Sequence, residues 1–437
     1  MTLTKPTLQT TPAKDYGPLQ LLVYCLCFLT MLIDGFDTQA ISFAAPYIQK
    51  EFGGDHAALG LIFGAGLFGG LIGGFSLGPV GDYIGRKPLL IGSLTVIVVG
   101  SIITAYTSMP ESMALIRFVT GIGLGGAIPS VIALSAEYAP PQKRSTIVAF
   151  VFSGFPIGAI VGAMIGSVIM PIWGWSMLFI VGGVAPMILL FAIVFFLPES
   201  INILKRKPNK ELKLKHIQEK LGPWYNTISK PASEAPHGNS KVSITQLFTE
   251  GRAYGTLIIW GLCFLSLLTV YCIVSWLPTL INATGLPIET AVMTVGIMNI
   301  GSVFGNIFLA RIADKRPPYN TTALFYGIGA CFIATIELAT TSSLLVFAIG
   351  LFAGVFSIGA QMSVTAIIAR FYPATIRSTG VGWAFAAGRI GGVAGPVIAG
   401  FFLAAGVSFH SLMLIIASLS LMSGLLMWLL GKFAKNS

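Results

Sequence analysis

The chain has 437 residues, of which 55% are hydrophobic and only 10% are charged, and its formal net charge is +10. So few charged residues cannot cover a water-soluble protein of this length with a polar surface, which excludes the soluble globular classes. The apolar stretches are longer than a barrel strand, and backbone groups in lipid must bond within their own segment, so an all-α membrane protein is predicted.

Charges and prolines divide the apolar sequence into twelve stretches that each approach the length needed to cross a bilayer. The first six are predicted at residues 19–48, 57–79, 89–107, 111–137, 146–169 and 174–197. The second six are predicted at residues 253–277, 288–312, 320–339, 343–368, 378–402 and 409–431. A polar, lysine-rich segment separates the two sets, which predicts an N-terminal six-helix bundle (1–198), a cytoplasmic linker (199–252) and a C-terminal six-helix bundle (253–437).

Lysine and arginine are concentrated at both ends of the chain and in the loops on one side of this helix map. By the positive-inside rule, both termini and the linker are expected in the cytoplasm, which requires an even number of spans. The basic linker is interpreted as a solvated loop rather than a segment that binds nucleic acid or lipid headgroups. The N-terminus shows no cleavable signal pattern.

Cysteines, histidines and glycines give no sign of a disulfide, metal or nucleotide site. All five cysteines lie inside predicted helices, and none of the four histidines lies at mid-membrane depth. The glycine string at residues 121–126 (GIGLGG) lies inside a span and follows no strand, so it predicts close helix contact. Because the sequence also has no phosphate-binding loop or nucleophile elbow, we expect neither an enzyme nor a cofactor.

The two halves of the chain are related by an internal repeat. Residues 140–146 (PPQKRST) match residues 373–379 (PATIRST) at an offset of 233, and Asp82 aligns with Asp314 at nearly the same offset. Two similar bundles in the same orientation suit a carrier that works by alternating access, rocking about a central site.

Two motifs resemble signatures of the major facilitator superfamily. Residues 78–87 (GPVGDYIGRK) resemble its loop 2-3 signature, and residues 117–129 (RFVTGIGLGGAIP) resemble its helix 4 signature. The resemblance implies twelve transmembrane helices in two pseudo-symmetric six-helix bundles. Asp82 is expected to accept hydrogen bonds from the N–H groups of a neighbouring helix. Gating roles are expected for the charged residues of the motif and the repeat, namely Asp82, Arg86, Lys87, Glu137, Arg144, Asp314 and Arg377.

Within that superfamily, the chain resembles the aromatic acid:proton symporters over almost its whole length. The resemblance rests on residues 34–37 (DGFD) in the first helix, residues 197–200 (LPES) and the stretch 373–396. It implies a functional monomer in the bacterial inner (cytoplasmic) membrane. The implied partners are a small aromatic carboxylate, protons and membrane lipid, and no nucleic acid.

Asp34 and Asp37 are the candidates for proton coupling. They lie three residues apart, so they share one face near the middle of an apolar helix. An ionised carboxylate at this depth costs about 2.5 to 3.5 kcal/mol, so the pair is expected to face water or a partner and to exchange protons. An interhelical ion pair is the alternative interpretation.

Two arginines lie inside predicted spans. Arg389 replaces Pro156 of the other half within an otherwise matched helix, and its guanidinium suits a substrate carboxylate, with a structural bridge to a helix carboxylate as the alternative. Arg117 is predicted near the extracellular edge, where its side chain reaches the interface. Coupling or structural pairing is expected of Arg117, which remains the second candidate for the substrate carboxylate.

An aromatic substrate also needs flat apolar walls with a few polar groups. Aromatic side chains lie on the predicted first, seventh and eleventh helices, which line the cavity in the fold implied by the resemblance, and Gln361 lies on the predicted tenth. The expected substrate-binding residues are Phe36, Tyr271, Gln361, Trp383 and Phe385, with Tyr271 and Gln361 as the polar readers of ring substituents.

The sequence therefore predicts a secondary active transporter that imports an aromatic carboxylic acid, such as a hydroxybenzoate, phenylpropionate or hydroxycinnamate, by proton symport. Two other functions remain open. A proton-coupled exporter or exchanger shares the implied fold, and residues 154–166 form an incomplete version of its helix 5 motif. A membrane receptor for aromatic acids is the other, although the sequence shows no appended signalling domain.

Overall fold

The computed structural model describes residues 17–53, 55–206, 244–313, 318–373 and 375–436, together with residues 212, 214, 217, 220 and 221. The N-terminal half contains α1 (Pro18–Glu51), α2 (His56–Ile84), α3 (Arg86–Thr104), α4 (Pro110–Glu137), α5 (Arg144–Phe152), α6 (Gly154–Trp173), α7 (Trp175–Phe196) and the short α8 (Ile201–Arg206). The C-terminal half contains α11 (Ala253–Ala283), α12 (Ile288–Ala313), α13 (Tyr319–Thr335), α14 (Ser343–Ala353), α15 (Gly359–Phe371), α16 (Arg377–Ala404) and α17 (Phe409–Asn436).

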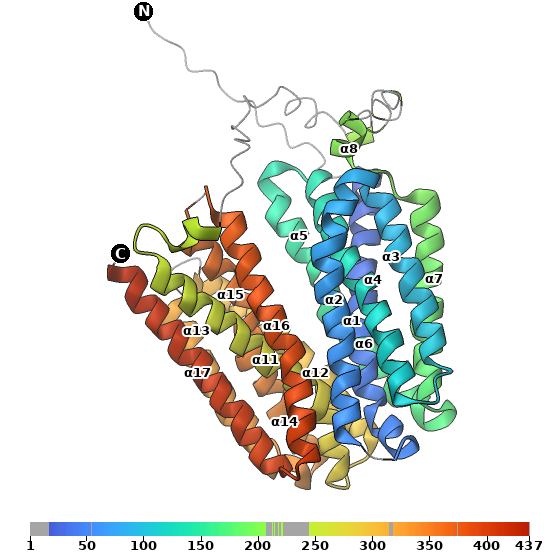
Figure 1. Cartoon of the computed structure of the whole chain (residues 1–437), viewed down its shortest axis with the longest axis vertical. Helices are drawn as coiled ribbons and strands as arrows, with labels where there is room; N and C mark the ends of the chain where they lie inside the picture. Colours follow the sequence, from blue (N-terminus) through green and yellow to red (C-terminus); the bar gives the residue numbers. More distant parts are fainter. Residues whose placement is uncertain are drawn as a thin grey trace, which may run out of the picture.

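These helices form two bundles, one from each half of the chain (Figure 1). Within the described residues, eleven helical spans are long and apolar enough to cross a membrane. The twelfth, α13, has 17 residues, which is at the short end of the range that spans a bilayer. The predicted all-α membrane fold of twelve helices is confirmed.

Two spans are less regular than the apolar pattern predicts. The fifth span is divided at Ser153 into α5 and α6. Pro156 has no N–H to donate to the carbonyl four residues earlier, which accounts for the break. In the tenth span, a π-helical turn (Gly354–Ile358) joins α14 to α15. The hydrophobic pattern alone does not report such changes of hydrogen bonding.

Glycines bring α2 and α4 into close contact in the N-terminal half. A Cβ atom at Gly121 would lie 2.0 Å from the Gly66 carbonyl oxygen, and one at Gly125 would lie 2.0 Å from that of Gly70. No side chain fits in such a contact, so the glycine string allows the two backbones to touch. The predicted contact face is confirmed for these two residues, whereas Gly123 faces the backbone of α3 at Ser93.

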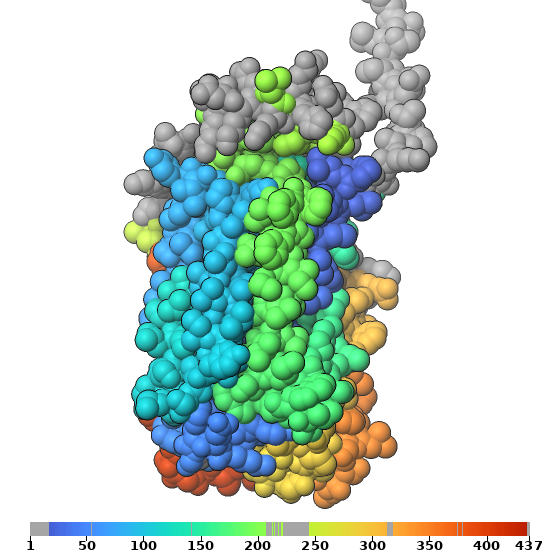
Figure 2. Space-filling model, turned by 90° about the vertical axis from the view of Figure 1, so that its right-hand side faces the viewer, coloured from blue at the N-terminus to red at the C-terminus, as the bar shows by residue number. Residues whose placement is uncertain are grey.

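The outward surface of the bundles is apolar. Figure 2 shows the outer face of the N-terminal half, where α3 and α7 run side by side. Large hydrophobic side chains are exposed there, including Ile103 of α3 and Ile188, Phe191 and Phe195 of α7. An apolar band of this kind is stable in contact with lipid, which agrees with a multi-pass membrane protein.

The halves meet along a seam formed by α1, α2 and α6 on one side and α11, α12 and α16 on the other. We call the end of the bundles near residues 17, 206 and 436 the linker end, and the other end the opposite end. At the opposite end, the His56 and Trp276 rings stack across the seam with 5.9 Å between their centroids. The bundles diverge towards the linker end (Figure 1). The structure is therefore closed at the opposite end.

Candidate substrate and proton site

Asp37 lies in a buried ion pair within the N-terminal half. Its carboxylate accepts hydrogen bonds from Arg117 Nη1 at 3.1 Å and from the Ser101 hydroxyl at 2.6 Å. The guanidinium also lies 5.3 Å from the centroid of the Phe179 ring. Arg117 is only 3% exposed, so the prediction that its side chain reaches the interface is wrong. The interhelical ion pair, the alternative interpretation of the aspartates, describes Asp37.

Asp34 has different surroundings, although it is also buried on α1. The Thr38 hydroxyl donates to its carboxylate at 3.5 Å, and Asp34 interacts electrostatically with Arg389 and Tyr271 of the other half. Asp34, Arg389 and Tyr271 therefore form one group across the seam. Asp37 is instead directed to α3 and α4, so its hydrogen-bond partners differ from those of Asp34, although the two carboxylates interact electrostatically with each other.

A glycine on α16 allows the Tyr271 ring to pack against the helix turn that carries Arg389. A Cβ atom at Gly392 would lie 2.8 Å from the Tyr271 ring, so only glycine leaves space for this ring. Gly392 follows Arg389 by three residues, which places both on the same face of α16. The phenol of α11 and the guanidinium of α16 are thus presented to the seam together.

Arg389 also bridges the two halves directly. Its Nη1 donates a hydrogen bond of 3.0 Å to the Gly70 carbonyl of α2. The guanidinium can come this close to α2 because the residue one turn after Gly70 is also small. A Cβ atom at Gly74 would lie 3.3 Å from Arg389 Nη1. The carbonyl occupies one of the five N–H donors of the guanidinium, so the others can bind a carboxylate.

A small recess lies between α11, α15 and α16. Gln361 and Phe385, two of the predicted substrate-binding residues, are part of its lining together with Leu267. Gln361 accepts a hydrogen bond of 3.2 Å from the Tyr326 hydroxyl. Phe385 precedes Arg389 by about one turn, so the recess adjoins the Asp34, Arg389 and Tyr271 group on its linker-end side. Its lining is mainly apolar, with the Gln361 amide and the Thr365 hydroxyl as polar groups.

The other two predicted aromatic walls lie elsewhere. Phe36 packs inside the N-terminal half, where Cβ atoms at Gly162 and Gly182 would lie 3.2 and 3.1 Å from its ring. Trp383 stacks on Trp260 with 5.9 Å between the ring centroids. The structure does not bring Phe36 or Trp383 into the group around Arg389. Helical periodicity does not say which neighbour a given face of a buried helix meets, so it could not place these two rings, and their role in substrate binding stays a prediction.

The charged residues of the loop 2-3 motif contact their own half. Asp82 pairs with Arg86, and Lys87 Nζ donates a hydrogen bond of 2.8 Å to the Val194 carbonyl of α7. Asp82 thus binds a side chain rather than the helix N–H groups predicted for it.

The remaining predicted gating residues lie at helix ends. The Glu137 carboxylate accepts a hydrogen bond of 2.7 Å from the Ser200 hydroxyl, and Arg377 Nε donates one of 3.2 Å to the Tyr372 carbonyl. Arg144 is exposed at the start of α5, and Asp314 lies outside the described residues. The contacts of Glu137 and Arg377 join segments of one half, so a gating role between the halves stays a prediction.

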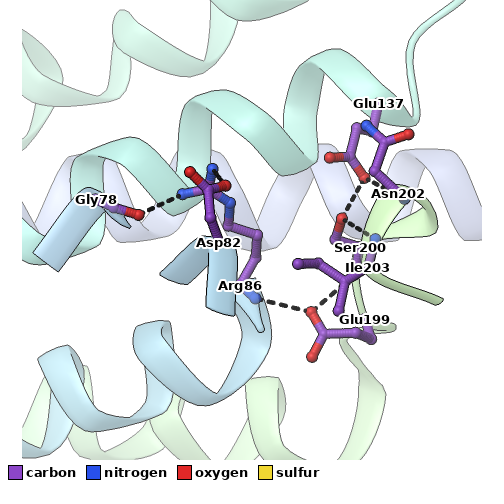
Figure 3. Close-up of polar contacts among 8 residues, drawn as sticks. All are labelled: Gly78, Asp82, Arg86, Glu137, Glu199, Ser200, Asn202 and Ile203. Carbon is purple, nitrogen blue, oxygen red and sulfur yellow. Dashed lines mark hydrogen bonds and ion pairs between the residues drawn. The ribbon is translucent and has the colours of Figure 1, made fainter. Parts of the chain in front are cut away.

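Glu199 is a positioning residue that the sequence analysis did not single out. Its carboxylate accepts a hydrogen bond of 2.9 Å from the backbone N–H of Arg86 (Figure 3). It accepts another of 3.0 Å from the backbone N–H of Lys87, and these are the first two residues of α3. It therefore caps α3 from another segment of the chain. Gly85, with a φ of 126°, leaves the space, because a Cβ atom there would lie 2.4 Å from Glu199 Oε2. The feature of the sequence that could have identified this cap is the acidic residue of LPES, which follows directly after a predicted span.

Removing this cap is expected to weaken the linker end of the N-terminal half. Glu199→Ala leaves two helix N–H groups without their acceptor, at a cost of about 1–2 kcal/mol. The apparent Tm of the purified protein should fall by roughly 2–4 °C. Glu250→Ala is the matched control, because Glu250 is 75% exposed. An equal Tm for the Glu199 and Glu250 variants would contradict the capping role.

Comparison with known proteins adds the decisive observation. The sequence model of the Major Facilitator Superfamily matches residues 27–364. The chain belongs to this superfamily. Its members are transporters, so this chain is a membrane transporter rather than an enzyme. The resemblance found in the loop 2-3 and helix 4 motifs is confirmed.

Two relatives in the superfamily align with nearly the whole chain. The 4-hydroxybenzoate transporter PcaK of Acinetobacter baylyi is 35% identical over 394 residues, which cover 89% of this chain and 86% of that protein. The 3-(3-hydroxy-phenyl)propionate transporter of Escherichia coli is 34% identical over 421 residues, which cover 96% of each. Among solved structures, the xylose transporter XylE from E. coli in a partially occluded inward open conformation has a TM-score of 0.72 and 17% identity, covering 94% of this chain and 98% of that one. That likeness concerns the fold alone.

Proposed function

We propose that this transporter imports an aromatic carboxylic acid together with protons, by alternating access. The observation that carries the proposal is the group of Arg389, Asp34 and Tyr271, in which a cation, a carboxyl group and a phenol from the two halves interact electrostatically across the seam. The names of the two relatives, both transporters of hydroxylated aromatic acids, support this class of substrate.

The substrate carboxylate binds to Arg389. The guanidinium forms parallel hydrogen bonds with a carboxylate and stays charged when partly buried. Arg117 is the weaker candidate for this role, because it is already bonded to Asp37. The ring lies against Tyr271 and the apolar recess, where Phe385 supplies a flat wall and Gln361 an amide for a ring substituent.

Asp34 carries a proton that accompanies the substrate. Asp34 and an anionic substrate are attracted to the same cation, Arg389, so the ionised aspartate and the bound anion disfavour each other. Asp37 and Arg117 form the second proton-linked pair. One elementary charge is worth about 2.3 kcal/mol per 100 mV, so two protons allow the membrane potential to drive uptake of a monoanion.

The linker end faces the cytoplasm in this proposal. Lysine and arginine concentrate in the loops and termini of that end, which supports an inner-membrane protein with both termini inside. The structure, closed at the opposite end, then represents the inward-facing state. The proposed boundaries are a six-helix bundle at 1–198, a cytoplasmic linker at 199–252 and a second bundle at 253–437, in a monomer surrounded by lipid.

Uptake into proteoliposomes tests the function. Radiolabelled 4-hydroxybenzoate and 3-(3-hydroxyphenyl)propionate are compared with xylose, with and without an inward proton gradient. We expect at least one aromatic acid to accumulate above its external concentration only when the gradient is present, and xylose not to accumulate. If no aromatic acid of a wider panel enters under any gradient, the proposed function is wrong.

A further inference from the structure

Two buried amide side chains join the halves near the middle of the seam. Gln39 Nε2 of α1 donates to Asn299 Oδ1 of α12 at 3.4 Å, and Asn299 Nδ2 donates back to Gln39 Oε1 at 3.2 Å. The two residues are 5% and 4% exposed. Neither belongs to the candidate substrate and proton site, so this reciprocal pair needs its own explanation.

The surroundings leave the two amides dependent on each other. One turn before Asn299, Gly296 faces α6, and a Cβ atom there would lie 2.8 Å from the Ala163 Cβ. The other N–H of the Asn299 amide is used by the Val295 carbonyl at 2.9 Å. In a contact this tight and apolar, an amide that loses its partner across the seam keeps a buried donor and a buried acceptor that have lost their hydrogen bonds, which is costly.

Alternating access requires this part of the seam to open. Gln39 and Asn299 belong to different halves, so they separate when the opposite end opens, and each amide then meets water. We propose that the Gln39–Asn299 pair is a latch that holds the opposite end closed and sets the balance between the two conformations. Gln39 follows Asp34 and Asp37 on α1, so the helix that carries the candidate proton-binding groups also carries the latch.

This latch predicts contrasting effects for single and double substitutions. Gln39→Leu or Asn299→Leu leaves one amide without its partner across the seam in the closed form only, because water satisfies it in the open form. The balance should move towards the form that is open at the opposite end by roughly 5- to 100-fold. Replacing both residues with leucine removes both polar groups, so the double variant should be at least as closed as the original chain.

A cysteine at Val397 reports the state of the seam. Its side chain faces α2 of the other half, since a Cβ atom at Gly64 would lie 2.3 Å from Val397 Cγ2. The rate of labelling by a membrane-impermeant maleimide is measured in the Val397→Cys chain, with the chain lacking this substitution as the background for the native cysteines. Thr294→Val is the matched control, because the Thr294 hydroxyl bonds within α12 to the Thr290 carbonyl.

We expect each single leucine variant to raise the labelling rate roughly 5- to 100-fold, and the double variant and Thr294→Val to leave it unchanged or lower. The exchanged pair Gln39→Asn with Asn299→Gln retains two facing amides and should lie closer to the original rate than either single variant. Equal labelling in the single and double variants, or single variants that match the Thr294 control, would overturn the latch. Neither outcome depends on which substrate is carried, so the latch and the proposed function fail separately.

Discussion

Arg389→Ala is expected to lower the initial rate of aromatic acid uptake by roughly 10- to 100-fold below the KM. Hydrogen bonds to a charged group contribute about 1.5–3 kcal/mol, and alanine removes all of those that Arg389 makes with the substrate carboxylate. Arg389→Lys keeps the charge but loses the planar fork of donors, so it should recover only part of the rate. The measurement is uptake into proteoliposomes, normalised to the amount of transporter in each preparation.

Two further variants separate substrate binding from general damage. Gly74→Ala places a methyl group against the Arg389 guanidinium, which should raise the KM while the Tm stays near that of the unmodified chain. Gly92→Ala is its matched control, because nothing lies within 4 Å of a Cβ atom at that position. Arg206→Ala removes an exposed arginine at the linker end and should leave uptake unchanged. Uptake by Arg389→Ala at the rate of Arg206→Ala would exclude Arg389 as the anchor.

Most of the fold is predictable because lipid restricts what a span can be. Charged residues and prolines mark where each apolar stretch must end, and the helices begin and end within a few residues of the predicted positions. The largest differences at the ends are the extensions of α11 to Ala283, of α2 to Ile84 and of α17 to Asn436. The break at Ser153 and the π-helical turn from Gly354 to Ile358 are local changes of hydrogen bonding that leave the hydrophobic pattern intact.

The candidate site was predictable at the position where one half of the internal repeat has a charged residue and the other half does not. Arg389 stands where the other half has Pro156, and the structure places it at the seam, where it interacts electrostatically with Asp34. Pairings between helices were not predictable in this way. The spacing of Asp34 and Asp37 does not show that one faces Arg389 and the other Arg117. Gln39 and Asn299 carry no charge, so nothing in the sequence distinguishes them from other polar residues inside a span.

Asp37→Asn is expected to destabilise the protein, whereas Asp34→Asn is expected to remove proton coupling with little loss of stability. Asp37 is the partner of a buried arginine, and removing one member of a buried pair costs about 3–5 kcal/mol because the other charge is left uncompensated. The cation that interacts with Asp34 is Arg389, which is only half-buried. When Asp34 is replaced, Arg389 still donates a hydrogen bond to the Gly70 carbonyl. The apparent Tm should therefore fall for Asp37→Asn and change little for Asp34→Asn.

Rescue and transport assays distinguish the roles of the two aspartates. Asp37→Asn combined with Arg117→Met removes both charges and should recover most of the lost Tm without restoring uptake, since replacing a buried pair by apolar volume is close to neutral for stability. Asp34→Asn should still exchange labelled for unlabelled acid across the membrane, because Arg389 remains, while accumulation driven by a proton gradient disappears. Gradient-driven accumulation by Asp34→Asn at the original level would show that Asp34 does not carry the proton. The coupling would then rest on the Asp37 and Arg117 pair alone.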